Sequence, residues 1–336
     1  DADSLQFHSK LEGWPAGTRM VTLGIGYRIG LNEFIREMKG DSRNIRDYLM
    51  SEVLSQQSPV MREYLVKTST LNRMSSSLCE ELCDHPEIDG SVFLEQLQTS
   101  NLFCIVLDEG GEWFRYHHLF QDLLTFSLEK RFSTEEIQNL HERAFTWFSE
   151  QGFIEDAMQH ALKAHKPSLA ISLIGHNRSQ LMEKEQWHRL RRLIQMLPAE
   201  IIQDEPEVLM IEAWSLIGFP EMNPVLDMIE NLMHASARKY PQGSKLWGEF
   251  WVLRSLQSYL DSDGDKALQQ ATTALACLPI EYGSERGFGI IMQAVSMQMD
   301  GDFKNGQNLV LDALRVNQTE NNTYHARLLS ALCFIY

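Results

Sequence analysis

The chain has 336 residues, with 46 acidic against 30 basic side chains, a net charge of −16 and 43% hydrophobic residues. This length predicts two or three domains, and the hydrophobic content excludes a disordered chain. The acidic excess extends along the whole chain, which argues against a nucleic-acid footprint anywhere in it. No apolar run approaches the roughly 18–20 residues that span a bilayer, and the first residues lack the features of a signal peptide.

The cysteine content and the two ends of the chain add two expectations. Five cysteines are few and odd in number for this length, which is typical of free thiols in a reducing cytoplasm. The sequence begins without Met and ends within an apolar helical pattern, so we expect a fragment of a longer, cytoplasmic protein.

The first third of the chain predicts helices followed by a small hairpin. Residues 1–48 are expected to be helical, with a start at Gly13, and a second helix is expected around 42–57. Three short helices are then expected at 59–68, 75–84 and 91–99. Two apolar stretches on either side of the turn EGGE predict a β-hairpin, and a helix over 118–132 closes the unit. Three helices, a hairpin and a final helix predict a winged-helix domain over 58–132.

From residue 133 onward the apolar residues recur at helical spacing. A helix over 134–150 is expected to start at a cap formed by Ser133 or Thr134 with Glu136, and Gly152 to end it before the next helix. The two form an αα-hairpin. Further helices are expected at 180–196, 206–217, 223–238, 245–260, 264–277, 285–299, 303–316 and 323–335.

A weak internal repeat supports a repeat architecture for this region. The motif Asp263-Gly264-Asp265 recurs as Asp300-Gly301-Asp302, an offset of 37 residues. This offset is close to the ~34 residues of a tetratricopeptide helix pair, and aspartate at a helix start is explained by capping alone. The fold class predicted is therefore mostly α: a helical arm and a winged helix, followed by an irregular tetratricopeptide-like α-solenoid over 133–336.

Three stretches in this order carry a family resemblance. They are GDSRNIRDYLMSEVLSQQ at 40–57, NLFCIVLDEGGEWFRYHHLFQDLL at 101–124 and LHERAFTWFSEQGFIEDAMQHALKA at 140–164. Together with GWPAG at 13–17, they resemble the MalT-type large ATP-binding LuxR regulators, which belong to the STAND class of signal-transduction ATPases. The resemblance covers about 1–215 and fades into generic solenoid beyond.

The resemblance implies which part of such a regulator this chain represents. In the family, a nucleotide-binding domain precedes a helical arm and a winged helix, and a tetratricopeptide-like sensor precedes a DNA-binding helix-turn-helix. This sequence has no G-x-x-x-x-G-K-[ST] loop and no basic C-terminal reader. We therefore expect the regulatory middle: an arm segment (1–57), a winged helix (58–132) and a sensor (133–336). ATP or ADP would be a cofactor of the full-length protein and not of this chain.

Two small motifs resemble nucleotide contacts of the family. Gly13-Trp14-Pro15 resembles the G-x-P motif of the helical arm, whose Pro packs on adenine; a plain helix start explains it equally well. Tyr116-His117-His118-Leu119 resembles the Met-His-Asp-Leu motif that closes the winged helix, so His117 falls at the place of the phosphate-binding His. The second His leaves this assignment uncertain by one position, and a His that caps the final helix is the alternative.

Other chemistry finds little support in the sequence. The third helix of the winged helix lacks Lys and Arg and the wing is acidic, so this domain is not expected to contact DNA. Cys79 and Cys83 are expected to face a core and not a metal. His160 and His165 are expected at the surface of one helix. No catalytic motif is present, so we do not expect an enzyme.

Two functions remain open. The first is the signal-sensing core of a transcriptional activator, whose solenoid binds an inducer small molecule or an inhibitory protein, with ligand-dependent self-association. DNA would be contacted only through the absent C-terminal domain, and the winged helix would dock on the absent nucleotide-binding domain. The second is a helical-repeat scaffold for protein partners, without a nucleotide switch. Aromatic candidates for ligand sensing are Trp187, Trp214, Trp247, Trp251 and Tyr259, although such residues more often pack in the core.

Overall fold

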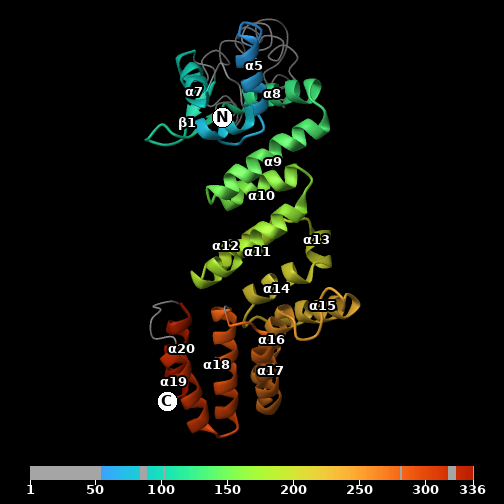
Figure 1. Ribbon diagram of the computed structural model, residues 1–336, viewed down its shortest axis with the longest axis vertical. Coiled ribbons are helices and arrows are strands. Elements are labelled where there is room, and N and C mark those ends of the chain that lie inside the picture. The colour runs from blue at the N-terminus through green and yellow to red at the C-terminus, as the bar shows by residue number, and fades with distance from the viewer. Residues whose placement is uncertain (1–53, 84–88, 101–102, 281, 317–322, 336) are drawn as a thin grey trace, which may run out of the picture. The chain divides into compact units, whose positions relative to one another are not determined.

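A computed structural model describes residues 54–83, 89–100, 103–280, 282–316 and 323–335. The expected arm segment (1–57) lies almost entirely outside these residues. The chain divides into two compact units, Asp1–His165 and Lys166–Tyr336. This division does not coincide with the expected boundary between 132 and 133, which stays a sequence-based prediction. Each unit is mostly helical, as expected from the sequence, and the two are described separately (Figure 1).

The described part of the first unit begins with the winged-helix elements. Helices α5 (Pro59–Thr68), α6 (Ser76–Cys83) and α7 (Gly90–Thr99) precede the strands β1 (Cys104–Val106) and β2 (Phe114–Tyr116), and α8 (His118–Arg131) follows. The strands pair antiparallel with Ile105 opposite Arg115. Each element lies within one or two residues of its expected range.

A compact core holds the winged-helix elements together. Leu65, Leu78 and Phe93 are fully buried, and the buried hydroxyl groups of Thr68 and Tyr116 lie 2.6 Å apart, joining α5 to β2. Cys79 belongs to the same core, as does Cys83 one turn later, and both are free thiols. Burial raises the pKa of the Cys83 thiol to about 12, so it stays protonated. The prediction that this pair faces a core is confirmed.

Helices α9 (Thr134–Glu150) and α10 (Ile154–Lys163) complete the first unit as an αα-hairpin. Ser133 and Glu136 form the capping box that the sequence predicts. Arg73, next to the winged-helix core, binds Asp156 of α10 at 2.7 Å, and its guanidinium lies 4.1 Å from the centre of the Trp113 ring. The ion pair therefore ties the hairpin to the winged helix, and so does a second cation–π contact, in which the same guanidinium lies 4.5 Å from the centre of the Phe153 ring.

The expectation for His160 is wrong. Its side chain is buried, and its Nδ1 lies 2.9 Å from Nδ1 of His141 on α9. His165 does not share its helix: it follows the end of α10, with a φ of 55°. The sequence pattern misplaced His160 because it occupies the apolar face of α10, beside Ala157 and Ala161.

The second unit consists of helices in succession. They are α11 (Pro167–Glu183), α12 (Trp187–Gln195), α13 (Ala199–Asp204), α14 (Pro206–Ser215), α15 (Met222–Ala235), α16 (Lys245–Leu260), α17 (Gly264–Cys277), α18 (Gly283–Met299), α19 (Phe303–Val316) and α20 (Thr323–Ile335). Helices that follow one another pack together from α16 to α20, and α18 also contacts α20 (Figure 1). This arrangement is that of a helical solenoid, in which each helix pair buries its apolar face on its neighbours.

Two details of the helices differ from the expectation. The expected helix over 180–196 is broken, because the chain turns at Glu185, whose φ is 53°, between α11 and α12. Gln186 N donates to Leu181 O there, the bond of a Schellman helix end that usually contains glycine. The 37-residue offset of the two motifs is also not the offset of the helix starts, since the aspartates that cap α17 and α19 are Asp263 and Asp302, which are 39 positions apart.

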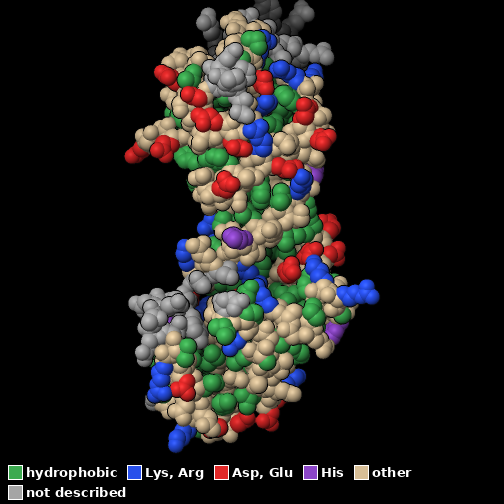
Figure 2. Space-filling view, in the orientation of Figure 1, with side chains coloured by type: hydrophobic (Ala, Val, Ile, Leu, Met, Phe, Trp, Pro, Cys, Tyr) green, Lys and Arg blue, Asp and Glu red, His purple; other side chains and the backbone are tan. Residues whose placement is uncertain are grey.

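The charged side chains of the described residues are spread over the surface. On the face seen in Figure 2, acidic and basic side chains of the described residues are interspersed. In the described ranges, no helix combines the length and the apolar character that crossing a membrane requires.

Candidate functional site

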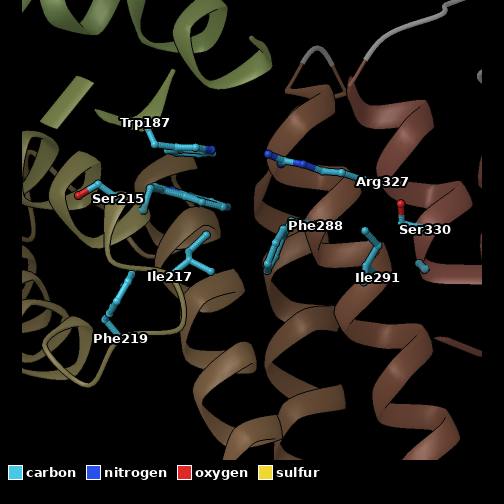
Figure 3. Close-up of a pocket in the computed structure, with 10 residues that line it drawn as sticks. Trp187, Ser215, Ile217, Phe219, Phe288, Ile291, Arg327 and Ser330 are labelled. Carbon is cyan, nitrogen blue, oxygen red and sulfur yellow. The ribbon is translucent and has the colours of Figure 1, made fainter. Parts of the chain in front are cut away.

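A pocket of about 540 Å³ lies within the second unit, where α12, α14, α18 and α20 meet (Figure 3). We name it the aromatic pocket. It is lined by Trp187, Trp214, Ser215, Ile217, Phe219, Phe288, Ile291, Arg327, Ser330 and Ala331. Its volume and mostly apolar wall are typical of a small-molecule site.

The local structure places each aromatic ring for a reason. Trp187 starts α12 directly after the helix break at Glu185, which leaves its side chain half-buried. Trp214 is buried near the end of α14 and packs edge-on against Phe288 of α18, with ring centres 5.7 Å apart. Phe219 follows Gly218, whose φ of 83° turns the chain, and it is exposed at the rim.

Arg327 is the one charged side chain among the described residues that line this pocket. It reaches from α20 towards Trp187, and its guanidinium carbon lies 5.9 Å from the centre of that ring (Figure 3). Its nitrogens also contact Glu185 Oε1 at 3.6 Å and Ser284 Oγ at 3.3 Å. These contacts fix the guanidinium at the edge of an apolar cavity, where it can bind an anionic group of a ligand.

Behind the aromatic pocket lies a buried charge cluster formed by Arg178, Glu249 and Glu285 from α11, α16 and α18. Trp214 Nε1 donates to Glu249 Oε2 at 3.0 Å, and Arg178 binds the same oxygen. Arg178 lies 3.7 Å from Glu285 Oε1. Burial, followed by the neighbouring Glu249 carboxylate, raises the pKa of Glu285. An indole that lines the aromatic pocket is thus hydrogen-bonded to a charge network that joins three helices.

The sequence-based sensing candidates do not all meet at this pocket. Trp187 and Trp214 line it. Trp247 is buried, stacks on Trp251 with ring centres 5.9 Å apart, and donates to Tyr240 O. Tyr259 lies half-buried near the end of α16. Trp247, Trp251 and Tyr259 therefore do not line this pocket, and the sensing role of Trp187 and Trp214 remains a prediction.

Of the candidate nucleotide-binding residues, only His117 lies in the part of the chain that the structure describes. Gly13 and Pro15 lie outside the described residues. His117 follows β2 directly, is buried, and its ring stacks on His118 with centres 4.6 Å apart. Its carbonyl oxygen accepts from the N–H groups of Phe120 and Gln121, so its backbone begins α8. The residues described contain no group of three His, Cys, Asp or Glu side chains that could hold a metal ion.

Sequence reasoning missed most of the pocket wall. Phe219, Phe288 and Arg327 belong to three segments that only the packing of α14, α18 and α20 brings together. Arg178 and Glu249 were missed as well. A charged residue on an otherwise apolar helix face, such as Glu249 between Trp247 and Phe250, is a signal that could have identified the cluster.

Comparison with known proteins gives results for both units. Residues 50–136 match the MalT winged helix domain. The chain is 28% identical over 284 residues to the HTH-type transcriptional regulator MalT of Cronobacter sakazakii, which covers 83% of this chain and 31% of that protein. It is 28% identical over 258 residues to the serine/threonine-protein kinase PknK of Mycobacterium tuberculosis, which covers 76% of this chain and 23% of the kinase. The chain thus spans less than a third of the length of these relatives.

Among solved structures, the chain is similar to a STAND protein with a tetratricopeptide repeat sensor from Pyrococcus horikoshii. The TM-score is 0.50 at 13% identity, over 99% of this chain and 56% of that one. At this identity the likeness concerns the fold. The resemblance to MalT-type regulators and the predicted combination of winged helix and helical solenoid are both confirmed.

Proposed function

We propose that this chain is the regulatory, signal-sensing portion of a larger MalT-like, LuxR-type transcriptional activator of the cytoplasm. In this proposal the solenoid binds an inducer, the winged helix relays binding to an ATP-dependent switch, and DNA is contacted by a separate domain. The chain itself has no catalytic role. The similarity to MalT along 83% of the chain supports the regulatory role.

The observation that carries the sensing role is the aromatic pocket. Two tryptophans and Phe288 offer flat apolar surfaces, and Arg327 offers one fixed positive charge at their edge. A ligand with a flat apolar face and an anionic group satisfies both features. Because Trp214 is hydrogen-bonded to Glu249, a ligand that shifts this indole also disturbs the charge cluster of α11, α16 and α18. That is a physical route from binding to helix packing.

The relay in the first unit rests on the contacts of Arg73. Its bonds to Asp156 and its stacking on Trp113 join the first helical hairpin to the wing of the winged helix. A movement of α10 is therefore transmitted to the wing. His117, between β2 and α8, is the residue at which a nucleotide phosphate would meet this domain, as the resemblance to the family implies.

The test uses the purified chain and a library of small anionic metabolites, with the rise in melting temperature as the signal. A true inducer stabilises the wild-type chain and loses at least about tenfold in affinity with Trp187→Ala or Arg327→Ala. Phe303→Ala, an exposed aromatic on α19 outside the pocket, is the matched control and should bind normally. Binding that is insensitive to both pocket substitutions would refute the assignment of this pocket.

A second test uses the full-length protein with a transcription reporter. Arg73→Met should uncouple inducer binding from activation, and His117→Ala should raise activity without inducer. If each variant folds normally and activates transcription like the wild type, with and without inducer, the proposed relay is refuted.

A helical-repeat scaffold without a nucleotide switch is the second candidate function. The similarity to a serine/threonine-protein kinase over 76% of the chain favours it, because a similar segment is then part of a protein of another class. Partner binding that persists in Trp187→Ala and is independent of any metabolite would support the scaffold.

A further inference from the structure

A second cavity in the solenoid unit is polar. It has a volume of about 500 Å³ and lies between α11, α14 and the start of α16. Its polar and charged lining residues are Ser172, Arg178, Glu207, Lys239, Tyr240, Ser244, Lys245 and Glu249. It shares no lining residue with the aromatic pocket.

Two polar atoms beside this cavity are buried and, within the described part of the chain, make no hydrogen bond: Ser244 Oγ and Glu249 Oε1. Glu249 is fully buried, and the Lys245 ammonium approaches its Oε1 only to 3.8 Å. Tyr240 is 5% exposed, with Lys239 as its charged neighbour. Buried polar atoms in native proteins almost always have a partner. Two such atoms beside one cavity are therefore open to a partner within it.

The start of α16 points to an anion. Ser244 has the extended backbone of an N-cap residue, yet its side chain accepts no hydrogen bond from the first helical turn. The free N–H groups of a helix start and its dipole favour a negative charge. Lys245 at the first helical position adds a full positive charge at the same place.

Glu249 narrows the choice of anion. An ionised carboxylate can only accept hydrogen bonds, so a ligand atom that faces Oε1 must be a donor. An anion without a proton, such as sulfate, meets only repulsion there. A phosphate group that retains one proton has both an O–H donor and several acceptor oxygens.

We propose that this polar cavity binds a phosphate monoester in its protonated form. The phosphate O–H donates to Glu249 Oε1, and the other oxygens accept from Ser244, Tyr240 and the start of α16. The cavity is much larger than a phosphate ion, and Ile171, Val208 and Ile211 provide an apolar wall for the organic part of the ester.

Calorimetric titration of the full chain at pH 6.5 tests this assignment with glycerol 3-phosphate, inorganic phosphate and sulfate at equal ionic strength. Saturable binding of the two phosphates with at least about tenfold weaker binding of sulfate is expected. Tighter binding of the ester than of inorganic phosphate identifies a monoester as the ligand class. Tighter binding of inorganic phosphate overturns the monoester assignment. Equal binding of phosphate and sulfate, or no binding of either phosphate, overturns the proposal altogether.

Variants localise the site. Ser244→Ala removes an atom that makes no hydrogen bond within the described residues, and Tyr240→Phe removes a hydroxyl whose partner is the exposed Lys239. Both should therefore keep nearly the wild-type melting temperature and weaken phosphate binding about tenfold each. Lys304→Gln, an exposed lysine of α19, is the control and should leave binding unchanged. Glu249→Gln places an N–H donor in the cavity and should remove the discrimination against sulfate. Unchanged phosphate affinity in both Ser244→Ala and Tyr240→Phe refutes the site. Trp187→Ala should not alter phosphate binding, which separates this test from that of the aromatic pocket.

Discussion

Replacing Arg178 by Met is expected to destabilise the solenoid strongly, because it leaves Glu249 and Glu285 buried without the guanidinium that they share. Arg178 is 6% exposed, Glu249 0% and Glu285 3%, so all three charges are largely shielded from bulk solvent. Removing one partner of a buried ion pair typically costs about 3–5 kcal/mol. This is a large part of the roughly 5–15 kcal/mol by which a domain is stable.

The loss of stability in Arg178→Met should also depend on pH, in a direction that the burial of the carboxyl groups sets. Without Arg178, the pKa of Glu285, which burial and the Glu249 carboxylate already raise, rises further because the guanidinium that lowers it is gone. The folded variant then holds more protons than the unfolded chain above the unfolded carboxyl pKa of about 4.3. Its stability therefore falls as the pH rises, by about 1.4 kcal/mol for each unit of pKa shift. The deficit should be larger at pH 7 than at pH 5.

Urea unfolding of the full chain, followed by circular dichroism at pH 5 and pH 7, measures both effects. Arg254→Met is the matched control, since Arg254 pairs with Asp227 and Glu230, whose carboxylates remain in contact with solvent. The control should cost at most about 1 kcal/mol at either pH. A deficit of less than 1 kcal/mol for Arg178→Met at pH 7, or one that is equal at both pH values, would refute the reasoning.

Three further predictions concern the first unit. Burial lowers the pKa of His141 to about 4 and of His160 to about 3, so the unfolded chain, with histidine pKa values near ~6.5, takes up protons first on acidification. The contribution of these histidines to stability should be complete above about pH 6.5. Below it, the free energy of unfolding should fall by up to about 1.4 kcal/mol per pH unit for each histidine down to about pH 4. His160→Leu should make the dependence of the urea midpoint on pH shallower, and an unchanged slope contradicts this. Gly90→Ala would place a Cβ 2.0 Å from the carbonyl oxygen of Ser76, so it should lower stability by at least about 1–3 kcal/mol in thermal unfolding; a neutral effect argues against this close approach. Ser133→Ala removes a capping box and should cost about 1 kcal/mol, in contrast to Ser244→Ala, which removes no cap.

The helices and their ends were largely predictable because their signals are local. The capping box at Ser133 and the glycine turn at Gly152 were read from the sequence, and both occur in the structure. The turn at Glu185 has the same type of hydrogen bond as that at Gly152, yet it was missed. A left-handed backbone conformation is predicted from the sequence where glycine occurs, and here a glutamate adopts that conformation.

The sites were less predictable because they depend on contacts between distant segments. Trp187 and Trp214 were named from the sequence as aromatic residues, but nothing local distinguishes them from Trp247, which packs in the core. Arg327 comes close to Trp187 only because α20 packs on α18.

By itself, the sequence determined the helical class, the winged helix, the family resemblance and the buried cysteine pair, because helical period, capping and motif order are properties of neighbouring residues. The tertiary structure alone decided which charges are buried together, which aromatic rings border a cavity and which polar atoms lack a partner. Those properties arise when Arg178, Glu249 and Glu285 meet from three helices, since burial and pairing are set by the packing between helices and not by the order of residues within one.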